Sequence, residues 1–339
     1  FLSDGIDSHA IAEAAHRPVT AYSYVHESHV GELETDYPTE MVRVSEETRY
    51  EDFDKCSGEL VEPLGDGAAL ATWQLVRAAG EHTTVFLCGH GGDEVMGGYR
   101  IQKDLVRLQA LRRLRMLPAP FARPFADKWL LGTEDFGERW KRWRNSTTLE
   151  SPAAARTLVQ GQLPVQDLQQ LLGGDACSSA FDSVDRLYAD TVEGSSILDR
   201  IQQVMLQTFL TENLMSYSDS TGMAWSTEIR TPFLDRDLVE FVLSLPPDER
   251  VRRHPGRQST KLVLRRWAQD RLSDAVIHRK KSGFTTGNIT GLLDSQNGEL
   301  RSRMLDQGAL RDAMPGLESW LQRDPADFRG PREGTLWAL

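Results

Sequence analysis

The chain has 339 residues, with 50 acidic and 39 basic side chains and a net charge of -11. This length allows one large domain or two modest ones, and the acidic balance argues against a nucleic-acid-binding surface. The arginine-rich residues 107–144 are interpreted as a solvated helical face. No apolar run reaches the roughly 18 residues of a membrane span. Three cysteines without metal-ligand spacing favour a reducing, cytoplasmic environment.

The first eight residues, FLSDGIDS, predict the end of a buried strand, a turn and the start of a helix. Such a strand–turn–helix directs backbone N–H groups and the positive end of a helix toward one point, which suits a phosphate. Ser3 and Ser8 can add hydroxyl donors, and Gly5 allows close backbone approach. Asp7 fits beside phosphate only with a cation between them, so it is predicted to be a Mg²⁺ ligand. A serine- and aspartate-rich helix cap is the alternative.

The next apolar segments predict further parallel strands. Strands are expected at 18–25, 40–44 and 84–88, and a helix at 67–79. The connection between the first two strands is short for a parallel crossover, so we expect a missing piece of chain near Ser28 and His29. The third strand runs into the acidic loop Gly89–Glu94, and two acidic loops at the carboxyl ends of parallel strands can share one metal-bound nucleotide.

Beyond Tyr99 the pattern becomes helical and polar. Residues 101–195 are predicted to be a helical insert, and more helices are expected at 201–217, 236–245 and 259–272. Asp235 can cap the second of these helices. The predicted fold is therefore α/β, with a parallel sheet of about five strands covered by helices on both faces, a helical insert and a helical C-terminal part.

Four motifs, taken in order, carry a resemblance to a known family. They are LSDGIDS at 2–8, GHGGDEVMGGY at 89–99, EIRTPFLDRDLVEFVLSLP at 228–246 and RKKSGF at 279–284. The first resembles the pyrophosphate loop of the N-type ATP pyrophosphatases, whose fold is adenine nucleotide alpha hydrolase-like. Together the four resemble the synthetase domain of the asparagine synthetase family. The resemblance implies ATP and Mg²⁺ as cofactors, adenylation of a carboxylate with release of pyrophosphate, and displacement of AMP by an amine.

The resemblance also implies roles for individual residues. Those matching the pyrophosphate loop are Ser3, Gly5, Asp7 and Ser8, and those matching the adenosine contacts are Leu2, Tyr24 and Gly89. Asp7 and Asp93 match the family's Mg²⁺ ligands; the alternative for Asp93 is a turn-forming aspartate. Glu94 matches a family acid, with a loop carboxylate that caps a backbone N–H as the alternative.

Lys281 matches the family's essential lysine, two residues before Gly283. A point charge on a flexible stem can follow the charge that develops at the α-phosphate, so Lys281 is predicted to be the catalytic cation. The alternative is membership of a basic surface run, in which Lys280 is the main competitor. Glu212 lies only loosely where β-lactam-forming relatives place an acid that orients their base.

Three departures from the family pattern bear on function. Asp4 replaces the first glycine of the loop and adds negative charge near phosphate unless its side chain turns away. Ser220 and Gly222 replace a usual arginine and serine, which weakens any carry-over of amino-acid recognition. His90 stands where asparagine synthetases usually have glutamate and β-lactam-forming relatives have tyrosine. A neutral histidine can accept a proton from an amine near pH 7, and a solvent-facing loop histidine is the alternative.

These inferences predict a synthetase-like domain at 1–290 and a C-terminal tail at 291–339. The absent Met and the short first strand predict more chain before Phe1, where the family places its glutaminase half. The first hypothesis is an amide-forming ligase that uses a carboxylate and ammonia, from glutamine or free, with a homodimer as a further possibility. The second is a natural-product amide ligase or a macrolactam- or β-lactam-forming cyclase. The third is a degenerate nucleotide-binding domain.

Overall fold

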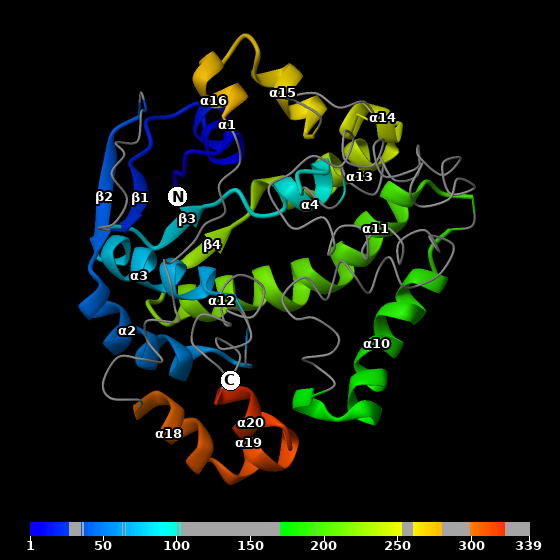
Figure 1. The fold of residues 1–339 in the computed structure, drawn as a ribbon. Helices are drawn as coiled ribbons and strands as arrows, with labels where there is room; N and C mark the ends of the chain where they lie inside the picture. Colours follow the sequence, from blue (N-terminus) through cyan, green and yellow to red (C-terminus); the bar gives the residue numbers. More distant parts are fainter. Residues whose placement is uncertain are drawn as a thin grey trace, which may run out of the picture.

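The computed structural model describes residues 1–26, 35, 37–62, 64, 66–99, 102, 170–192, 194–252, 260–279 and 299–322. The strands are β1 (Ala21–His26), β2 (Thr39–Val44), β3 (Val85–Leu87) and β4 (Glu228–Arg230). Helices in the first third are α1 (Ile6–Ala14), α2 (Glu46–Glu59), α3 (Ala68–Gly80) and α4 (Gly92–Met96). Figure 1 shows the strands between helices that lie on both sides, which confirms an α/β protein.

The remaining helices follow a long stretch that lies outside the described residues. They are α10 (Gly174–Ala189), α11 (Ile197–Met205), the π-helix η2 (Leu206–Met215), α12 (Ser216–Met223), the 3₁₀ turn η3 (Pro232–Leu234), α13 (Arg236–Ser244), α14 (Pro247–Arg250), α15 (Leu262–Ala268), α16 (Asp274–His278), α18 (Glu299–Asp306), α19 (Gly308–Ala313) and α20 (Leu317–Leu321). The predicted helix at 236–245 is thus confirmed as α13, and its predicted cap Asp235 accepts hydrogen bonds from two backbone N–H groups.

The strands pair in two separate parallel sheets. β1 lies beside β2, with Ala21 opposite Thr39, and β3 lies beside β4, with Val85 opposite Glu228. The prediction of one sheet of about five strands is therefore wrong for the described residues, which form two sheets of two strands each. β4 was not predicted, because its three residues, Glu-Ile-Arg, do not form an apolar strand pattern.

Phe1 and Leu2 lie between the two sheets. The Leu2 N–H donates to the Tyr22 carbonyl of β1 at 2.9 Å, and the Phe1 nitrogen donates to the Leu87 carbonyl of β3 at 2.6 Å. These two residues therefore link β1 and β3 by single hydrogen bonds, while the described strands pair as β1–β2 and β3–β4. The expected break near Ser28 and His29 lies outside the described residues.

Helix α3 holds the two sheets together from one side. Leu75, Val76 and Ala79 of this helix are buried against Tyr22 of β1 and Phe86 of β3. α3 is buried around most of its circumference, because α12 and α2 pack on it as well. Its bounds agree with the helix predicted at 67–79.

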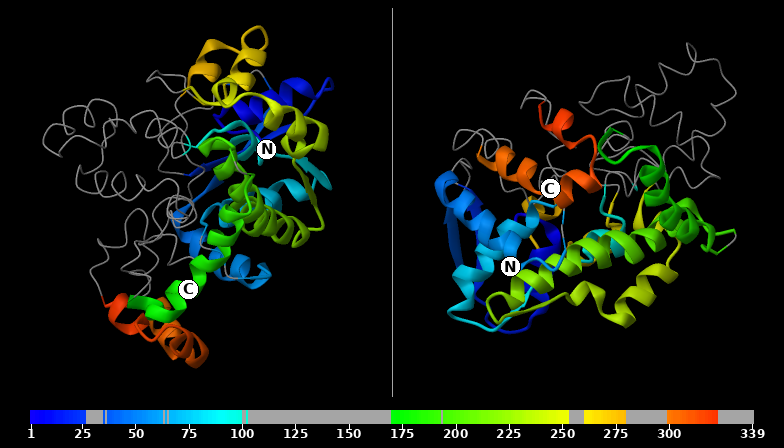
Figure 2. Two further views of the ribbon diagram at one scale, coloured as in Figure 1. Left: turned by 90° about the vertical axis from the view of Figure 1, so that its right-hand side faces the viewer. Right: turned by 90° about the horizontal axis from the view of Figure 1, so that it is seen from below.

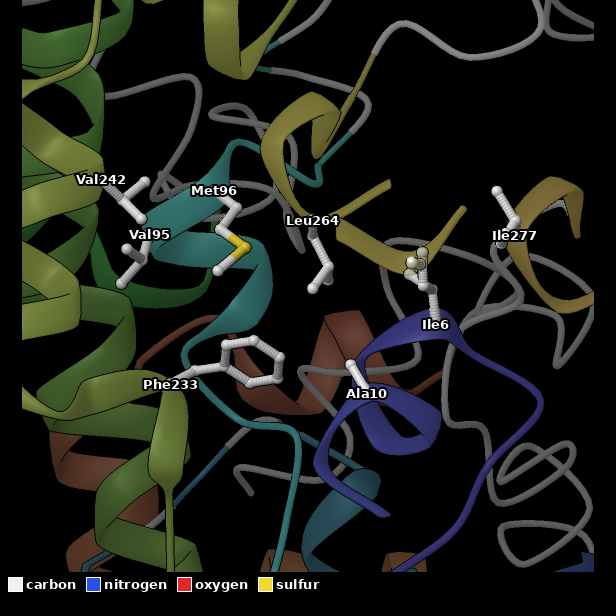
Figure 3. Packing of buried hydrophobic residues seen from close by; sticks show 9 residues of the cluster. Ile6, Ala10, Val95, Met96, Phe233, Val242, Leu264 and Ile277 are labelled. Atoms are coloured by element: carbon white, nitrogen blue, oxygen red, sulfur yellow. The ribbon is translucent and has the colours of Figure 1, made fainter. Parts of the chain in front are cut away.

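A second core lies where the ends of the strands meet the following helices. Ile6 and Ala10 of α1, Val95 and Met96 of α4, and Leu264 of α15 are buried in one cluster. Figure 3 shows these side chains converging with three others, Phe233, Val242 and Ile277, from the segments around α13 and α16. Burial of apolar surface stabilises this cluster. Because α1 and α4 both contribute to it, the cluster fixes the positions of the loops that precede them.

Residues 197–223 form one continuous helical rod, made of α11, η2 and α12 in succession. It begins at a capping box between Ser196 and Asp199 and crosses the molecule, as the views in Figure 2 show. The prediction of a helix at 201–217 was therefore too short at both ends. Its middle ten residues are π-helical, a local change of helical winding that is frequent at functional sites.

Most of the predicted insert at 101–195 lies outside the described residues, apart from Gln102 and the region of α10. In the predicted tail, α18, α19 and α20 pack around Trp320 and reach back to Leu171. Their sequences have little periodicity, and tertiary packing of a few apolar side chains makes them helical. None of the described helices combines the length and the apolar character that a membrane crossing requires.

Candidate active site

The loop from Ser3 to Ser8 is held in shape by its own serines. The Ser3 N–H donates to Ser8 Oγ at 3.0 Å, and Ser8 Oγ lies 2.9 Å from the Ser3 carbonyl and 3.1 Å from the Gly5 carbonyl. Ser8 is buried, whereas Ser3 is exposed. Ser8 therefore fixes the loop from within, and the groups that the loop presents outward are Ser3 and the backbone at the start of α1.

Gly5 is the N-cap residue of α1 and has an extended backbone. The first N–H groups of a helix have no partner within that helix, and the helix dipole adds partial positive charge there. The buried His9 ring lies 3.1 Å from the Gly5 carbonyl through Nδ1, which ties this cap to the next turn. The predicted helix start after this loop is present as α1, and phosphate binding by it stays a prediction.

Asp7 and Asp93, from α1 and α4, come together around one buried ammonium group. Lys261 Nζ contacts Asp7 Oδ2 and lies 2.6 Å from Asp93 Oδ1. The Lys261 residue is only 4% exposed. Burial by itself would lower the pKa of Lys261, but the two carboxylates outweigh it and raise that pKa above its ordinary value. Lys261 is therefore a permanent cation at the meeting point of the two predicted acidic ligands.

Lys261 was not predicted from the sequence. In the structure it has an unusual backbone conformation and an unusual place for a positive charge. It has φ 52° and ψ 41°, in the left-handed region that non-glycine residues rarely adopt. It also stands at the N-terminal end of α15, where the helix dipole disfavours a positive charge. Such departures persist where the surroundings compensate for them, and here two carboxylates do so.

Glycines leave room for this ion cluster. A Cβ at Gly92 would lie 3.0 Å from Asp7 Oδ1, and one at Gly89 would lie 3.1 Å from Asp7 Cβ. A Cβ at Gly98 would overlap both the Asp93 carboxylate and the Lys261 side chain. The loop after β3 can approach α1 and α15 this closely only because these positions carry no side chain.

We expect Gly98→Ala to disrupt the cluster, since its new methyl group meets the Asp93 carboxylate and the stem of a buried lysine. Neither neighbour can move into solvent without separating the ion pairs, so the free energy of unfolding should fall by about 2–4 kcal/mol. Chemical denaturation would measure this loss. Gly58→Ala is the matched control, because a Cβ at Gly58 meets nothing within 4 Å. Equal stability of the two variants would contradict the packing described.

Glu94, the other acid of this loop, is part of a buried hydrogen-bond network. Its side chain is buried and accepts a hydrogen bond from the Tyr99 hydroxyl. The Gln202 amide donates to the carbonyls of Glu94 and Val95, and the buried Arg250 donates to the Gln202 side-chain oxygen. This network anchors the start of α4 to α11 and α14. Glu94 is therefore placed as a support of the loop that carries Asp93.

His90 contacts two hydroxyl groups of α12 through its ring nitrogens. Its Nε2 lies 3.3 Å from the Tyr217 hydroxyl and its Nδ1 lies 3.0 Å from Ser218 Oγ. Burial raises the pKa of Tyr217 well above its ordinary value, so this hydroxyl stays protonated. Burial also lowers the pKa of His90 to about 4, so the imidazole is neutral at pH 7. The ring nitrogens thus face α12, whereas Asp7 and Asp93 face Lys261.

The lowered pKa of His90 predicts a loss of stability in acid. In the unfolded chain a histidine has a pKa of about 6.5, so between pH 6.5 and 4 the unfolded state binds more protons than the folded state. The contribution is complete above pH 6.5 and disappears as the pH falls to 4, with a size on the order of 2 kcal/mol. Denaturation curves of wild type and His90→Gln should therefore converge in this window. His82→Gln, at an exposed histidine, should keep the wild-type pH dependence.

The residues predicted to contact adenosine lie beside the loop. Leu2 is buried and bonds to β1 through its N–H, while Tyr24 of β1 packs against the cluster around Phe86. Leu2, Tyr24 and Gly89 thus border the same end of the strands as Ser3 and Asp7. Their contacts with a nucleotide remain a prediction.

Other residues singled out in the sequence have structural partners. Glu228 and Arg230 form an exposed ion pair with each other. Ser220 Oγ donates to the Ser216 carbonyl of its own helix, and a Cβ at Gly222 would come within 2.6 Å of the Thr227 carbonyl. A serine at position 222 would therefore not fit the tight turn from α12 to β4. Lys280 and Lys281 lie outside the described residues.

Taken together, these features define an α/β protein in which a serine-containing loop at the start of α1 and an acidic loop after β3 meet around Lys261. The family model described as asparagine synthase matches residues 1–320. The chain therefore belongs to the asparagine synthase family, as the four motifs indicated.

Curated relatives agree with this assignment. The chain is 26% identical over 298 residues to asparagine synthetase [glutamine-hydrolyzing] 1 of Bacillus subtilis, covering 84% of this chain and 45% of that protein. It is 37% identical over 72 residues to asparagine synthetase [glutamine-hydrolyzing] 3 of the same organism, covering 21% of this chain and 11% of that protein. The chain thus spans less than half the length of these relatives.

Proposed function

We propose that this chain is the ATP-using part of an amide-forming ligase. A substrate carboxylate attacks the α-phosphate of ATP, pyrophosphate leaves, and ammonia or another amine then displaces AMP from the acyl-adenylate. The observation that carries the proposal is the convergence of the Ser3–Ser8 loop with Asp7, Asp93 and Lys261 at one end of the strands. Family membership supports the same chemistry.

The chain's own residues have distinct tasks in this proposal. The backbone at the start of α1 and the Ser3 hydroxyl bind the pyrophosphate part of ATP, and Ser8 keeps that loop in shape. Lys261 offsets one of the two negative charges of Asp7 and Asp93, which reduces their repulsion of a polyanion. Lys281, from its match to the family motif, stabilises the charge that develops at the α-phosphate.

The residues present also fit Mg²⁺, which the family resemblance implies. Asp7 and Asp93 offer carboxylate oxygens, the donors that Mg²⁺ takes in nucleotide sites, and one ammonium, that of Lys261, leaves this pair of acids with a net negative charge. When bound, the ion would supply neutralisation of phosphate charge. Asp7 and Asp93 are the residues that would hold it.

The second candidate function keeps adenylation and changes the nucleophile. His90 is neutral at pH 7 and the hydroxyls of Tyr217 and Ser218 contact both of its ring nitrogens, so it offers no negative charge to an ammonium ion. This observation favours an amine other than ammonia, as in a natural-product ligase or a macrolactam- or β-lactam-forming cyclase. If aspartate and ammonia are the substrates, carboxylates such as Asp7 and Asp93, and not His90, would have to attract the ammonium ion.

The organisation of the whole protein belongs to the proposal as well. Residues 1–290 form the synthetase-like domain, with the insert at 101–195, and 291–339 form its C-terminal part. A glutaminase half would lie upstream of Phe1 and deliver ammonia from glutamine. A homodimer and a cytoplasmic location are consistent with this organisation.

ATP–pyrophosphate exchange in the full-length protein tests the function. We expect exchange in the presence of one carboxylate from a panel of aspartate, other amino acids, peptides and small acids, and its loss in Asp7→Asn. Exchange with aspartate followed by ammonia-dependent asparagine formation selects the first function. Exchange only with another acid, followed by an amine-dependent amide, selects the second. Absence of exchange across the panel, with nucleotide still bound, would instead support a non-catalytic domain.

A further inference from the structure

Asp4 places a negative charge inside a loop that is proposed to bind a polyanion. It stands between Ser3 and Gly5, next to the N-terminal end of α1. An unpaired carboxylate several ångströms from a multiply charged phosphate would weaken binding on the order of tenfold. The chain must therefore either direct this charge away or neutralise it.

The structure pairs this carboxylate with Arg279. Arg279 Nη2 lies 3.0 Å from Asp4 Oδ2, and both side chains are partly exposed. Arg279 directly follows the last residue of α16 and caps its C-terminal end. The ion pair thus joins the proposed pyrophosphate loop to a segment more than 270 positions later in the chain.

The position of Arg279 is fixed by packing rather than by the ion pair alone. Ile277 of α16 is buried in the same cluster as Ile6 of α1. The Arg265 guanidinium of α15 donates to the Ile277 carbonyl, which holds the end of α16 in place. Arg279 is therefore presented to the loop by a docked helix, so it reaches Asp4 without a large loss of conformational freedom at the backbone.

We propose that Arg279 is a positioning residue that neutralises Asp4 and so allows this loop to accept a nucleotide phosphate. The inference rests on the proposed nucleotide site and adds a residue and a role to it. Asp4 departs from the glycine that the family has at this position, and Arg279 is the compensating charge. In this arrangement the guanidinium acts through Asp4 and does not itself contact the phosphate.

A double-mutant cycle separates this role from two alternatives, in which Arg279 binds phosphate directly or forms only an ordinary surface ion pair. The dissociation constant of Mg-ATP would be measured by calorimetry at low, constant salt for wild type, Arg279→Gln, Asp4→Asn and the double variant. We expect Arg279→Gln to weaken binding about tenfold in the wild-type background and less than about twofold when Asp4 is already Asn. Arg279→Lys should restore most of the affinity, because it restores the charge.

The other outcomes of this experiment overturn either the inference about Arg279 or the proposed function. An equal loss in both backgrounds would mean that Arg279 binds phosphate directly, and no loss in either would mean an ordinary surface ion pair; both overturn the inference alone. Wild type that binds no nucleotide would overturn the proposed function, and the inference with it. Arg303→Gln is the matched control, since Arg303 also pairs with an aspartate, Asp54, at 3.0 Å. Figure 1 shows its helix α18 at the opposite end of the molecule from α1.

Discussion

Replacing Lys261 with alanine should lower both stability and activity, more than any other single change among the described residues of the site. The change removes the buried ammonium from between Asp7 and Asp93 and leaves these two partly buried carboxylates without that compensating charge. Removing one partner of a buried ion pair costs about 3–5 kcal/mol. Chemical denaturation should show a loss of this size, and ATP–pyrophosphate exchange should fall by at least about 100-fold.

The same variant tests the metal prediction without an activity assay. With the lysine gone, the two carboxylates lose its compensating charge, so millimolar Mg²⁺ should raise the unfolding free energy of Lys261→Ala more than that of wild type. Adding Asp93→Asn should remove this Mg²⁺ effect and recover part of the lost stability, because the like-charge contact disappears. Lys55→Ala, at an exposed lysine of α2, is the matched control. Wild-type stability of Lys261→Ala would refute the buried cluster.

The predictions of strands and helices were correct where the local sequence pattern agrees with burial in the structure. Residues 84–88 are almost wholly apolar and follow a helix that ends at Gly80, and β3 and α3 lie there. The pairing of the strands was not predictable in the same way, because it depends on residues distant in sequence. β4 is polar at both ends, and its pairing with β3 is continued by two flanking hydrogen bonds, in which the Glu228 N–H donates to the Thr84 carbonyl and the Cys88 N–H donates to the Arg230 carbonyl. The predicted single sheet is wrong for the described residues, in which β1 pairs with β2 and β3 pairs with β4.

The acidic residues of the site were predictable, because carboxylates beside a phosphate loop need a cation. The buried lysine that lies between them was not predictable from the sequence alone. Lys261 follows a polar segment and has no motif around it of the kind that singled out Lys281. It is brought to Asp7 and Asp93 by the packing of α15 against α1 and α4. For His90 the sequence suggested an amine-facing base, while its two contacts with α12 depend on the path of the rod through η2.

Lys281→Ala is expected to abolish adenylation while leaving nucleotide binding nearly intact. The sequence motif predicts that this lysine follows charge from the α-phosphate to the adenylate, so its contribution should arise mainly in the transition state. A lost electrostatic contact of this kind lowers the rate by about 100- to 1,000-fold. Exchange kinetics should therefore show a fall in kcat with little change in the KM for ATP.

The neighbouring Lys280 supplies the matched control, because it has the same charge in the same basic run. Lys280→Ala should retain exchange within about threefold of wild type, since its place in the motif assigns it no role at the α-phosphate. If Lys280→Ala instead loses exchange and Lys281→Ala keeps it, the register of the motif is shifted by one residue. Equal losses in both would indicate that the run acts by its summed charge, and then moderate salt should weaken wild-type activity as well. Because Lys261 is buried against two carboxylates, its contribution should be far less sensitive to salt, and ionic strength thus separates the two lysines.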